Sequence, residues 1–318
     1  TFIVIGIGLL YAETGTLNMV DLAKRLADQP LSRTIGASFG FLVVGISLKL
    51  ALFPLHLWLP NAYTYAPSVV SAFLAATATK VAVYVLLRFL FTVFDVELSF
   101  GFMPLDTMLF VLAVIAMFAA SAVAIFQTNL KRMLAYSSVA QIGYIILGIS
   151  FANVNGLAAG ILHLFNHALI KGGMFLALGC IFYRLATVNI NDMAGIGRRM
   201  PWTMGAFVVG GLGLIGVPLT VGFISKWYLV LGALERDWWL AAALVLLSSL
   251  LAVVYVWRVI EVAYLKPVPK NASKIEDAPP AMLIPTWLLI GASIYYGIST
   301  ELTVGVAKQA AQQLLGVS

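Results

Sequence analysis

The stretch LKLALFPLHLWLP, Leu48 to Pro60, places a lysine, a histidine and two prolines in a long apolar run. It closes a segment over 34–59, which is long enough to cross a bilayer, since a spanning helix needs about 20 mostly apolar residues. A proline inside a helix removes one backbone hydrogen bond and clashes with the preceding turn. The stretch therefore predicts a membrane helix that is broken near Pro54, with Lys49 beside the break and His56 just after it.

The composition of the whole chain predicts an all-α polytopic membrane protein. Of its 318 residues, 62% are hydrophobic and 10% are charged, whereas about a quarter of a typical soluble domain is charged. The apolar runs are unbroken and do not alternate, which favours helices over barrel strands. Eight full spans are expected, at 34–59, 67–94, 104–126, 133–151, 157–183, 202–231, 238–263 and 281–300.

The segment Thr1 to Ala12 is apolar but too short to span, because 12 helical residues reach only about 18 Å. It lacks the positive region of a signal peptide, so we interpret it as part of a ninth helix in a chain truncated at its N-terminus. The longer loops, 13–33 and 264–280, are expected to be plain connectors. The single cysteine, Cys180, allows no internal disulfide and no iron–sulfur cluster.

The net charge of +6 does not indicate nucleic-acid binding, because the basic residues form no stripe. Those in loops sort onto two sides of the membrane. One side holds Lys131, Arg132, Arg184, Arg198, Arg199, Arg258, Lys266, Lys270 and Lys274, and the other holds Lys24, Arg25, Arg33, Arg88, Arg236 and Lys308. Cytoplasmic loops carry an excess of lysine and arginine, so the first side is predicted to be cytoplasmic and the C-terminus to lie outside.

Four lysines fall inside the predicted spans, namely Lys49, Lys80, Lys171 and Lys226. A lysine at the centre of a spanning helix costs about 2.5–3.5 kcal/mol when it faces lipid, so these side chains are expected to face protein or water. Such residues mark ion or proton pathways, and structural polar pairs are the alternative.

The sequence HLFNHALIK spaces His163, His167 and Lys171 four residues apart, which puts all three on one helix face. Imidazole accepts and donates protons near neutral pH, so a proton relay is the favoured interpretation and structural hydrogen bonding the alternative. A zinc protease motif needs glutamate where Leu164 stands. Haem ligation would draw its two histidines from different helices. No metal or cofactor site is expected.

A second break is predicted in GVPLTVGFISK, where Pro218 lies eight residues before Lys226 among several glycines. Two interrupted helices, each with a lysine near the break, are typical of transporters built from inverted repeats, although a simple proline kink is the alternative at either site. The nearby GLGLIG, Gly211 to Gly216, matches the G-x-G-x-x-G pattern of dinucleotide-binding sites. It does not indicate such a site, because it lies inside a spanning segment with no preceding strand.

Four motifs then carry a family resemblance over nearly the whole chain. They are KLALFPLHLWLPNAYTYAPSVVSAFLAATATK, QTNLKRMLAYSSVAQIGY, ILHLFNHALIKGGMFLALGCIFYR and GLIGVPLTVGFISKWYLVLGAL. The chain resembles the antiporter-like membrane subunits of respiratory complex I and of Mrp-type sodium/proton antiporters. The resemblance implies about fourteen helices in two inverted repeats. Residues 1–94 would end the first repeat, 95–265 would form the second, and 266–318 would be connector, last helix and tail.

The resemblance also implies roles for the buried basic residues. Lys49 matches the lysine beside the first break, which the family pairs with a glutamate on a helix outside this chain. Lys80 matches the residue that links two half-channels. His163 and His167 match polar positions on the central axis, and Lys226 matches the terminal ionisable residue. Lys171 would extend this axis, while Pro54, His56 and Pro218 would support it.

The function implied is proton translocation within a multisubunit cation/proton antiporter, in the place of the Mrp D-type protein. Lysine at positions 80 and 226 argues against two of the antiporter-like subunit types of complex I. The sequence from Gln127 to Tyr144 favours the Mrp D type over the remaining complex I type. A proton-pumping subunit of complex I (NADH:quinone oxidoreductase) or of a related membrane hydrogenase is the alternative. Such a protein would share the oxidoreductase designation without a redox site of its own.

Two further classes stay open from the sequence. A secondary transporter for an organic solute would also use broken helices, but with an aromatic-lined pocket at mid-membrane. A catalytically silent scaffold within a larger complex is the other class, and it predicts no loss of the complex's activity when the lysines are removed. The expected setting is the bacterial inner membrane, with lipid and other membrane subunits as partners and H⁺, with Na⁺ as a second candidate, as the ion.

Overall fold

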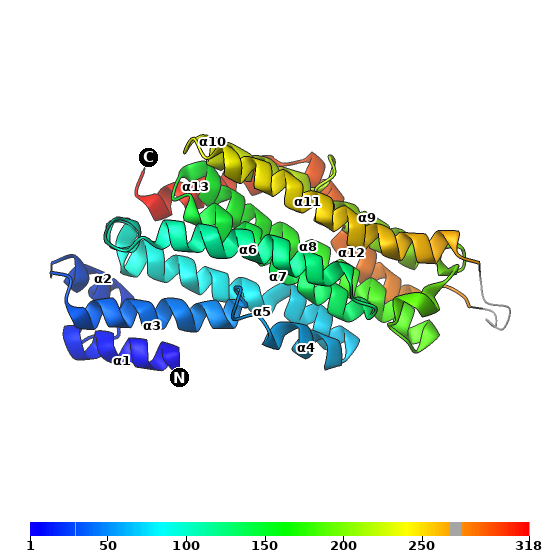
Figure 1. The fold of residues 1–318 in the computed structure, drawn as a ribbon, viewed down its shortest axis with the longest axis horizontal. Coiled ribbons are helices and arrows are strands. Elements are labelled where there is room, and N and C mark those ends of the chain that lie inside the picture. The colour runs from blue at the N-terminus through cyan, green and yellow to red at the C-terminus, as the bar shows by residue number, and fades with distance from the viewer. Residues whose placement is uncertain (29, 268–274, 318) are drawn as a thin grey trace.

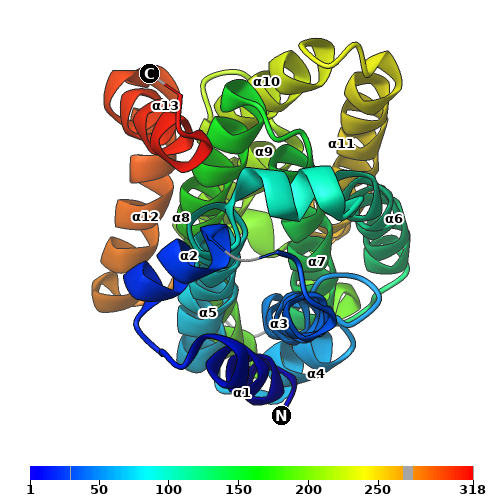
Figure 2. The same ribbon diagram turned by 90° about the vertical axis from the view of Figure 1, so that its left-hand side faces the viewer.

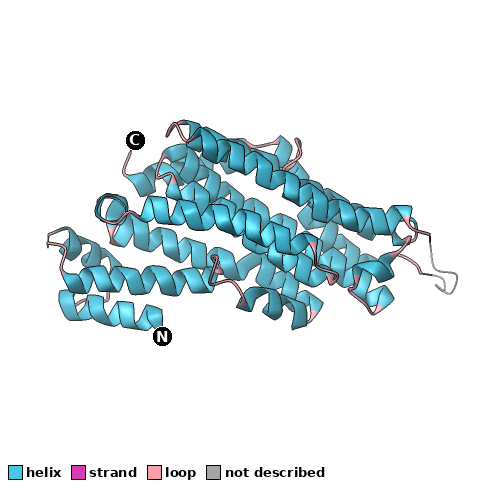
Figure 3. Ribbon diagram, in the orientation of Figure 1, coloured by secondary structure: helices cyan, strands magenta, loops and turns pink. Residues whose placement is uncertain are grey.

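The computed structural model describes residues 1–28, 30–267 and 275–317. Every regular element in these ranges is a helix (Figure 3), and the long helices lie side by side along the long axis of the molecule (Figure 1). The α-helices are α1 (Phe2–Thr14), α2 (Met19–Ala27), α3 (Arg33–Leu50), α4 (Trp58–Tyr65), α5 (Ser68–Arg88), α6 (Leu105–Ile125), α7 (Leu130–Ser150), α8 (Val154–Leu185), α9 (Pro201–Ile215), α10 (Val221–Leu234), α11 (Trp239–Ile260), α12 (Pro280–Ile298) and α13 (Glu301–Leu315). Shorter π- and 3-10 segments are η1 (Phe89–Val93), η2 (Glu97–Phe102), η3 (Ile190–Met193), η4 (Ile196–Arg198) and η5 (Glu261–Leu265).

The predicted all-α membrane architecture is confirmed. Seven helices in the described part of the chain are long and apolar enough to cross a membrane, and α1 with α2 would make an eighth if that bent pair is one span. The seven coincide with seven of the eight predicted segments. The remaining segment, 202–231, appears as two shorter apolar helices, α9 and α10, which a break separates.

The structure differs from one local expectation and refines two others. The span predicted over 34–59 is broken near Pro54 as expected, because α3 ends at Leu50 and α4 begins at Trp58. The expected connector 13–33 contains α2, because the Asn18 side chain accepts hydrogen bonds from the backbone of Val20 and Asp21 and so caps a helix start. The C-terminal tail forms α13. In the connector 264–280, Lys270 and Lys274 lie outside the described residues.

Polar caps fix where the long helices begin. The Ser32 side chain accepts from the Ile35 amide at the start of α3, and Asn129 accepts from the Arg132 amide at the start of α7. Asn153 does the same at the start of α8. Such caps satisfy amide groups that have no partner inside the helix, which matters most where water is scarce.

The helices α7 and α8 form the centre of the bundle. Figure 2, which views the molecule end-on, shows both surrounded by other helices. All of the apolar window of α7 is buried, and α8 packs against α5, α7, α9, α10, α12 and α13. Small residues allow this close packing: a Cβ atom on Gly148 of α7 would lie only 2.5 Å from the Gly156 carbonyl oxygen of α8.

The loops gather at two ends, as the sorting of basic residues predicts. At one end, an Arg258 Nη1 donates to the Gln127 carbonyl at 2.9 Å, and Arg184 Nε donates to the Asp277 carbonyl at 3.0 Å. At the other end, Arg236 pairs with Asp106 at 3.2 Å and donates to the carbonyls of Ser150 and Phe151. Which end faces the cytoplasm stays a prediction.

Candidate functional site

Both predicted helix breaks are present. The first separates α3 from α4, where Ala51 takes a left-handed conformation (φ 62°) and Pro54 lies in the following turn. The second separates α9 from α10, where Gly216 takes φ 89° and Pro218 follows. Backbone carbonyls at such breaks have no helical partner, so inside a membrane they need another donor.

Lys226 supplies that donor at the second break. Its Nζ donates to the carbonyl oxygens of Leu214 and Ile215, the last residues of α9, at 3.0 and 2.8 Å, and to Ser249 Oγ of α11 at 2.9 Å. The same Nζ lies 4.6 Å from the centre of the Tyr144 ring, which is cation–π distance. The amine is buried, with 7% of the residue exposed. Four helices therefore meet around one basic group.

His163 of α8 lies next to this cluster. Its Nδ1 is 2.8 Å from Ser225 Oγ, and its Nε2 is 2.8 Å from Gln141 Oε1, so both ring nitrogens are engaged. The ring centre is 5.6 Å from that of Tyr144 and 6.1 Å from that of His167, and the two imidazoles are nearly parallel. Neither nitrogen of His167 has a partner among the described residues.

Lys171 and Lys80 continue the row of buried groups. Lys171 of α8 is fully buried and donates to the Leu134 carbonyl at 2.8 Å and to Ser137 Oγ, both of α7. Lys80 of α5 is 6% exposed and donates to the Ala75 carbonyl within its own helix.

These amines have no acidic partner in the described part of the chain. The ion pairs found there are Arg25–Asp21 and Arg236–Asp106, and neither touches a buried lysine. Carbonyl and hydroxyl oxygens hold the three buried amines instead. In the same ranges, no three His, Cys, Asp or Glu residues lie close enough together to hold a metal ion.

Two further predicted residues lie at the first break. Lys49 is on the last turn of α3, where its side chain is exposed. His56 is buried in the first break and stacks on Phe53 with ring centres 5.1 Å apart, while the ring centre of Tyr136 lies 6.3 Å away. The role expected of Lys49 stays a prediction.

Sequence reasoning missed the polar side chains that connect the row, namely Gln141, Tyr144, Ser225 and Ser249. One signal was present in α7. Ser137, Gln141 and Tyr144 are spaced four and three residues apart, so they share a helix face in a largely apolar span. The structure turns that face toward α8 and α10, where it meets Lys171 and His163 of α8 and Lys226 of α10.

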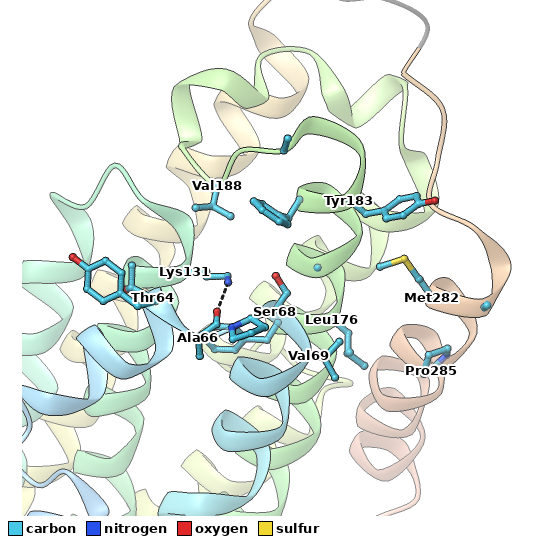
Figure 4. Close-up of a pocket in the computed structure, with 17 residues that line it drawn as sticks. Thr64, Ala66, Ser68, Val69, Lys131, Leu176, Tyr183, Val188, Met282 and Pro285 are labelled. Atoms are coloured by element: carbon cyan, nitrogen blue, oxygen red, sulfur yellow. Dashed lines mark hydrogen bonds between the residues drawn. The ribbon is translucent and has the colours of Figure 1, made fainter.

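A large apolar groove lies elsewhere, between the start of α5, the end of α8 and the start of α12 (Figure 4). Its volume is about 1020 Å³, and Lys131 in its lining donates to the Ala66 carbonyl at 2.8 Å. Aromatic residues line it, as the organic-solute alternative requires. However, it sits at helix ends, and its lining includes none of the predicted site residues. It is therefore not the mid-membrane pocket of that alternative.

Comparisons with known proteins identify a family of membrane proteins that matches most of the chain. The family model described as NADH:quinone oxidoreductase/Mrp antiporter, TM, matches residues 1–252. The N subunit of the NADH-quinone oxidoreductase of Desulforudis audaxviator is 44% identical, and the match covers 94% of the chain. The D subunit of the Na(+)/H(+) antiporter of Alkalihalophilus pseudofirmus is 27% identical, with 98% covered. The chain spans 62% of the length of each of these two relatives.

A solved structure shows the same arrangement of helices. A chain of the membrane-bound sulfane sulfur reductase, an archaeal respiratory membrane complex, superposes with a TM-score of 0.88. The two chains are 32% identical, and the match covers 99% of this chain and 63% of that one. The fold resemblance therefore extends over the whole of the chain, including the helices that follow residue 252.

Proposed function

Because this chain belongs to the NADH:quinone oxidoreductase/Mrp antiporter transmembrane family, we propose that it translocates protons as a membrane component of a multisubunit cation/proton antiporter. The observation that carries the proposal is the row of buried basic groups, Lys80, His163, His167 and Lys226, in the middle of the bundle. Burying basic groups in a membrane is costly, and such groups are characteristic of proton and ion pathways.

The proposed route runs from Lys49 through Lys80 and the pair His163/His167 to Lys226. Contacts support the last part of this order, because the His163 ring centre lies 6.1 Å from that of His167 and 5.6 Å from that of Tyr144, and Lys226 Nζ lies 4.6 Å from the Tyr144 ring. The proton affinity of each group depends on its solvation and on neighbouring charge, so a proton that moves at one site changes the next.

Lys171 extends the row along α8. It is four residues beyond His167, and it is fully buried. Its position near Ser137 and the first turns of α7 lies toward the end of the bundle that holds Lys131 and Arg184. We propose that Lys171 leads from the central axis toward that surface.

The two breaks also support a repeat arrangement. In each case an apolar helix stops at a left-handed residue, a proline follows, and a second short helix leads to a long span. We propose that residues 1–94 belong to one repeat, 95–265 to the other, and 266–318 to a connector, last span and tail. Pro54 and Pro218 would then hold matching places, with His56 packed into the first break.

A second host complex has direct support. The identity to an N-type protein of an NADH-quinone oxidoreductase is 44%, against 27% to a D-type protein of a Na(+)/H(+) antiporter, which favours a proton-pumping role in a quinone oxidoreductase complex. Both hosts assign the same proton-translocating function to the chain. They differ in the driving force: a counter-ion gradient across the membrane in one, and electron transfer by partner subunits in the other.

The proposal is tested with the full-length chain in its own complex, in inside-out membrane vesicles that contain a pH-sensitive dye. Lys226→Ala and Lys49→Ala should each abolish coupled proton movement, while the amount of complex in the membrane stays at the parental level. A Na⁺ jump that drives the parent identifies the antiporter host, and NADH that drives it identifies the oxidoreductase. Parental proton movement in both variants would contradict the proposed route.

A further inference from the structure

Tyr144 is a buried residue that contacts two groups of the proposed proton route. It lies on α7 with 1% of its surface exposed, its ring centre is 5.6 Å from that of His163 on α8, and Lys226 Nζ of α10 lies 4.6 Å from the same ring centre. Its hydroxyl donates to Ser248 Oγ of α11 at 2.9 Å. This bond and the surrounding helices fix the orientation of the ring.

The surroundings of Lys226 match a protonated amine. An ammonium group has three N–H donors, and the site offers three acceptors, the carbonyls of Leu214 and Ile215 and the hydroxyl of Ser249. Ser249 Oγ in turn donates to the Val245 carbonyl at 2.9 Å, which leaves its lone pairs for the amine. A neutral amine has only two N–H donors, so it would leave one of these acceptors without a partner.

The Tyr144 ring provides the remaining contact, and this contact also favours the charged form of the Lys226 amine over the neutral form. The face of an aromatic ring carries negative charge density and attracts a cation within about 6 Å of its centre. Lys226 Nζ lies at 4.6 Å, inside that range. The attraction is electrostatic, so it acts on the ammonium form and is largely absent for the neutral amine.

We propose that Tyr144 is a positioning residue that holds the protonated Lys226 side chain in the break between α9 and α10, and releases it when the amine gives up its proton. The inference rests on the proposed function, since it assigns a role within that proton route. The contact to His163 places the ring directly beside the neighbouring group of the route, with centres 5.6 Å apart.

The test replaces Tyr144 in the full-length chain, assembled in its complex, by phenylalanine and by a series of fluorinated phenylalanines. Fluorine withdraws electron density from the ring face while the ring keeps nearly the same size, so the fold is retained and only the cation–π attraction weakens. The rate of proton movement into vesicles is compared with that of the phenylalanine variant, which keeps the ring but lacks the hydroxyl. It should then fall stepwise, by about 2- to 30-fold in total, as fluorines are added.

Tyr63 provides the matched control. It is equally buried, and its hydroxyl donates to the Leu74 carbonyl at 3.1 Å, but its ring packs against Phe175 and, among the described residues, over no lysine amine. The same series at position 63 should leave the rate unchanged. An equal loss at both positions would overturn the inference, because it would reflect packing alone.

Lys226→Ala, measured in the same vesicles, distinguishes a failure of the Tyr144 role from a failure of the proposed function. If Lys226→Ala abolishes proton movement but the most fluorinated ring at position 144 transports like phenylalanine, the role of Tyr144 is wrong and the proposed function stands. If Lys226→Ala transports normally, the proposed function fails and the role of Tyr144 fails with it. A stepwise loss at position 144 together with an inactive Lys226→Ala supports both.

Discussion

The contact between α9 and α10 gives the sharpest prediction for a single small substitution. A Cβ atom on Gly222 of α10 would lie 1.8 Å from the Gly213 carbonyl oxygen of α9. Separations below 3.0 Å are essentially never observed for Cβ atoms, and the obstructing atoms here are backbone, which cannot turn aside. Gly222→Ala must therefore open the break by about 1.2 Å.

This opening acts on Lys226, whose amine bridges the two helices. Its bonds to the Leu214 and Ile215 carbonyls are 3.0 and 2.8 Å long. An opening of this size lengthens them to about 4 Å, which is outside the range of a hydrogen bond. Hydrogen bonds to charged groups contribute about 1.5–3 kcal/mol, so we expect proton movement to fall about 10- to 100-fold. The steric strain should lower stability by about 1–3 kcal/mol.

The assay combines the initial rate of proton movement into vesicles with the melting temperature of the purified complex. Gly291→Ala on α12 is the matched control, because no heavy atom lies within 4 Å of its added Cβ. There the substitution should leave transport unchanged and raise stability slightly, by about 0.5–1 kcal/mol, since alanine favours a helix more than glycine does. If Gly222→Ala transports and melts like Gly291→Ala, the close contact is not what holds Lys226.

Three further predictions concern single side chains. Arg236→Gln should lower the melting temperature by the equivalent of about 1 kcal/mol without changing the rate of proton movement. The reason is that the ion pair with Asp106 is partly exposed at one end of the bundle. An unchanged melting temperature would contradict this prediction. Gln141→Leu removes the acceptor 2.8 Å from His163 Nε2 and should slow proton movement about 2- to 10-fold in a fully assembled complex, so a parental rate would show that this contact is dispensable. Gly148→Ala puts a Cβ 2.5 Å from the backbone of α8 and should cost about 1–3 kcal/mol in thermal unfolding, whereas normal melting would mean that the two central helices adjust freely.

Local patterns in the sequence were sufficient for most of the fold. A run of about 20 apolar residues in lipid must form a helix, because each backbone group has to find its partner within the segment. Pro54 and Pro218 indicated the two breaks, because proline has no backbone N–H group to donate a helical hydrogen bond. The histidines and Lys171 on α8 were found because polar residues four apart stand out in an apolar helix.

The remaining features depend on how helices pack together. In a soluble helix a polar face marks the solvent side, but α7 is buried all round, so the face that Gln141 and Tyr144 share did not show which helices it contacts. Ser225 and Ser249 became part of the site only through contacts between different helices. The helices α2 and α13 are less apolar than the spans, and their sequences were therefore taken for connector and tail.

Lys49 carries a clear sequence signal, and its role stays a prediction. Its position beside a proline break and its place in the family resemblance both assign it to the proton route. In the structure it is exposed on the last turn of α3, while Lys80 on α5 is buried. A lysine in a predicted span identifies a group that needs a partner, but the sequence does not show which neighbour supplies it.

The rate of proton movement in Lys80→Met vesicles tests the central claim most directly, because Lys80 is the buried basic group that the proposed route places next to the two histidines. Lys24→Met, at an exposed site on α2, is the control for the loss of one lysine. We predict that Lys80→Met abolishes coupled proton movement while Lys24→Met keeps the parental rate, with equal amounts of complex in both membranes. Parental proton movement in Lys80→Met would contradict the account, because protons would then cross without the central member of the buried row.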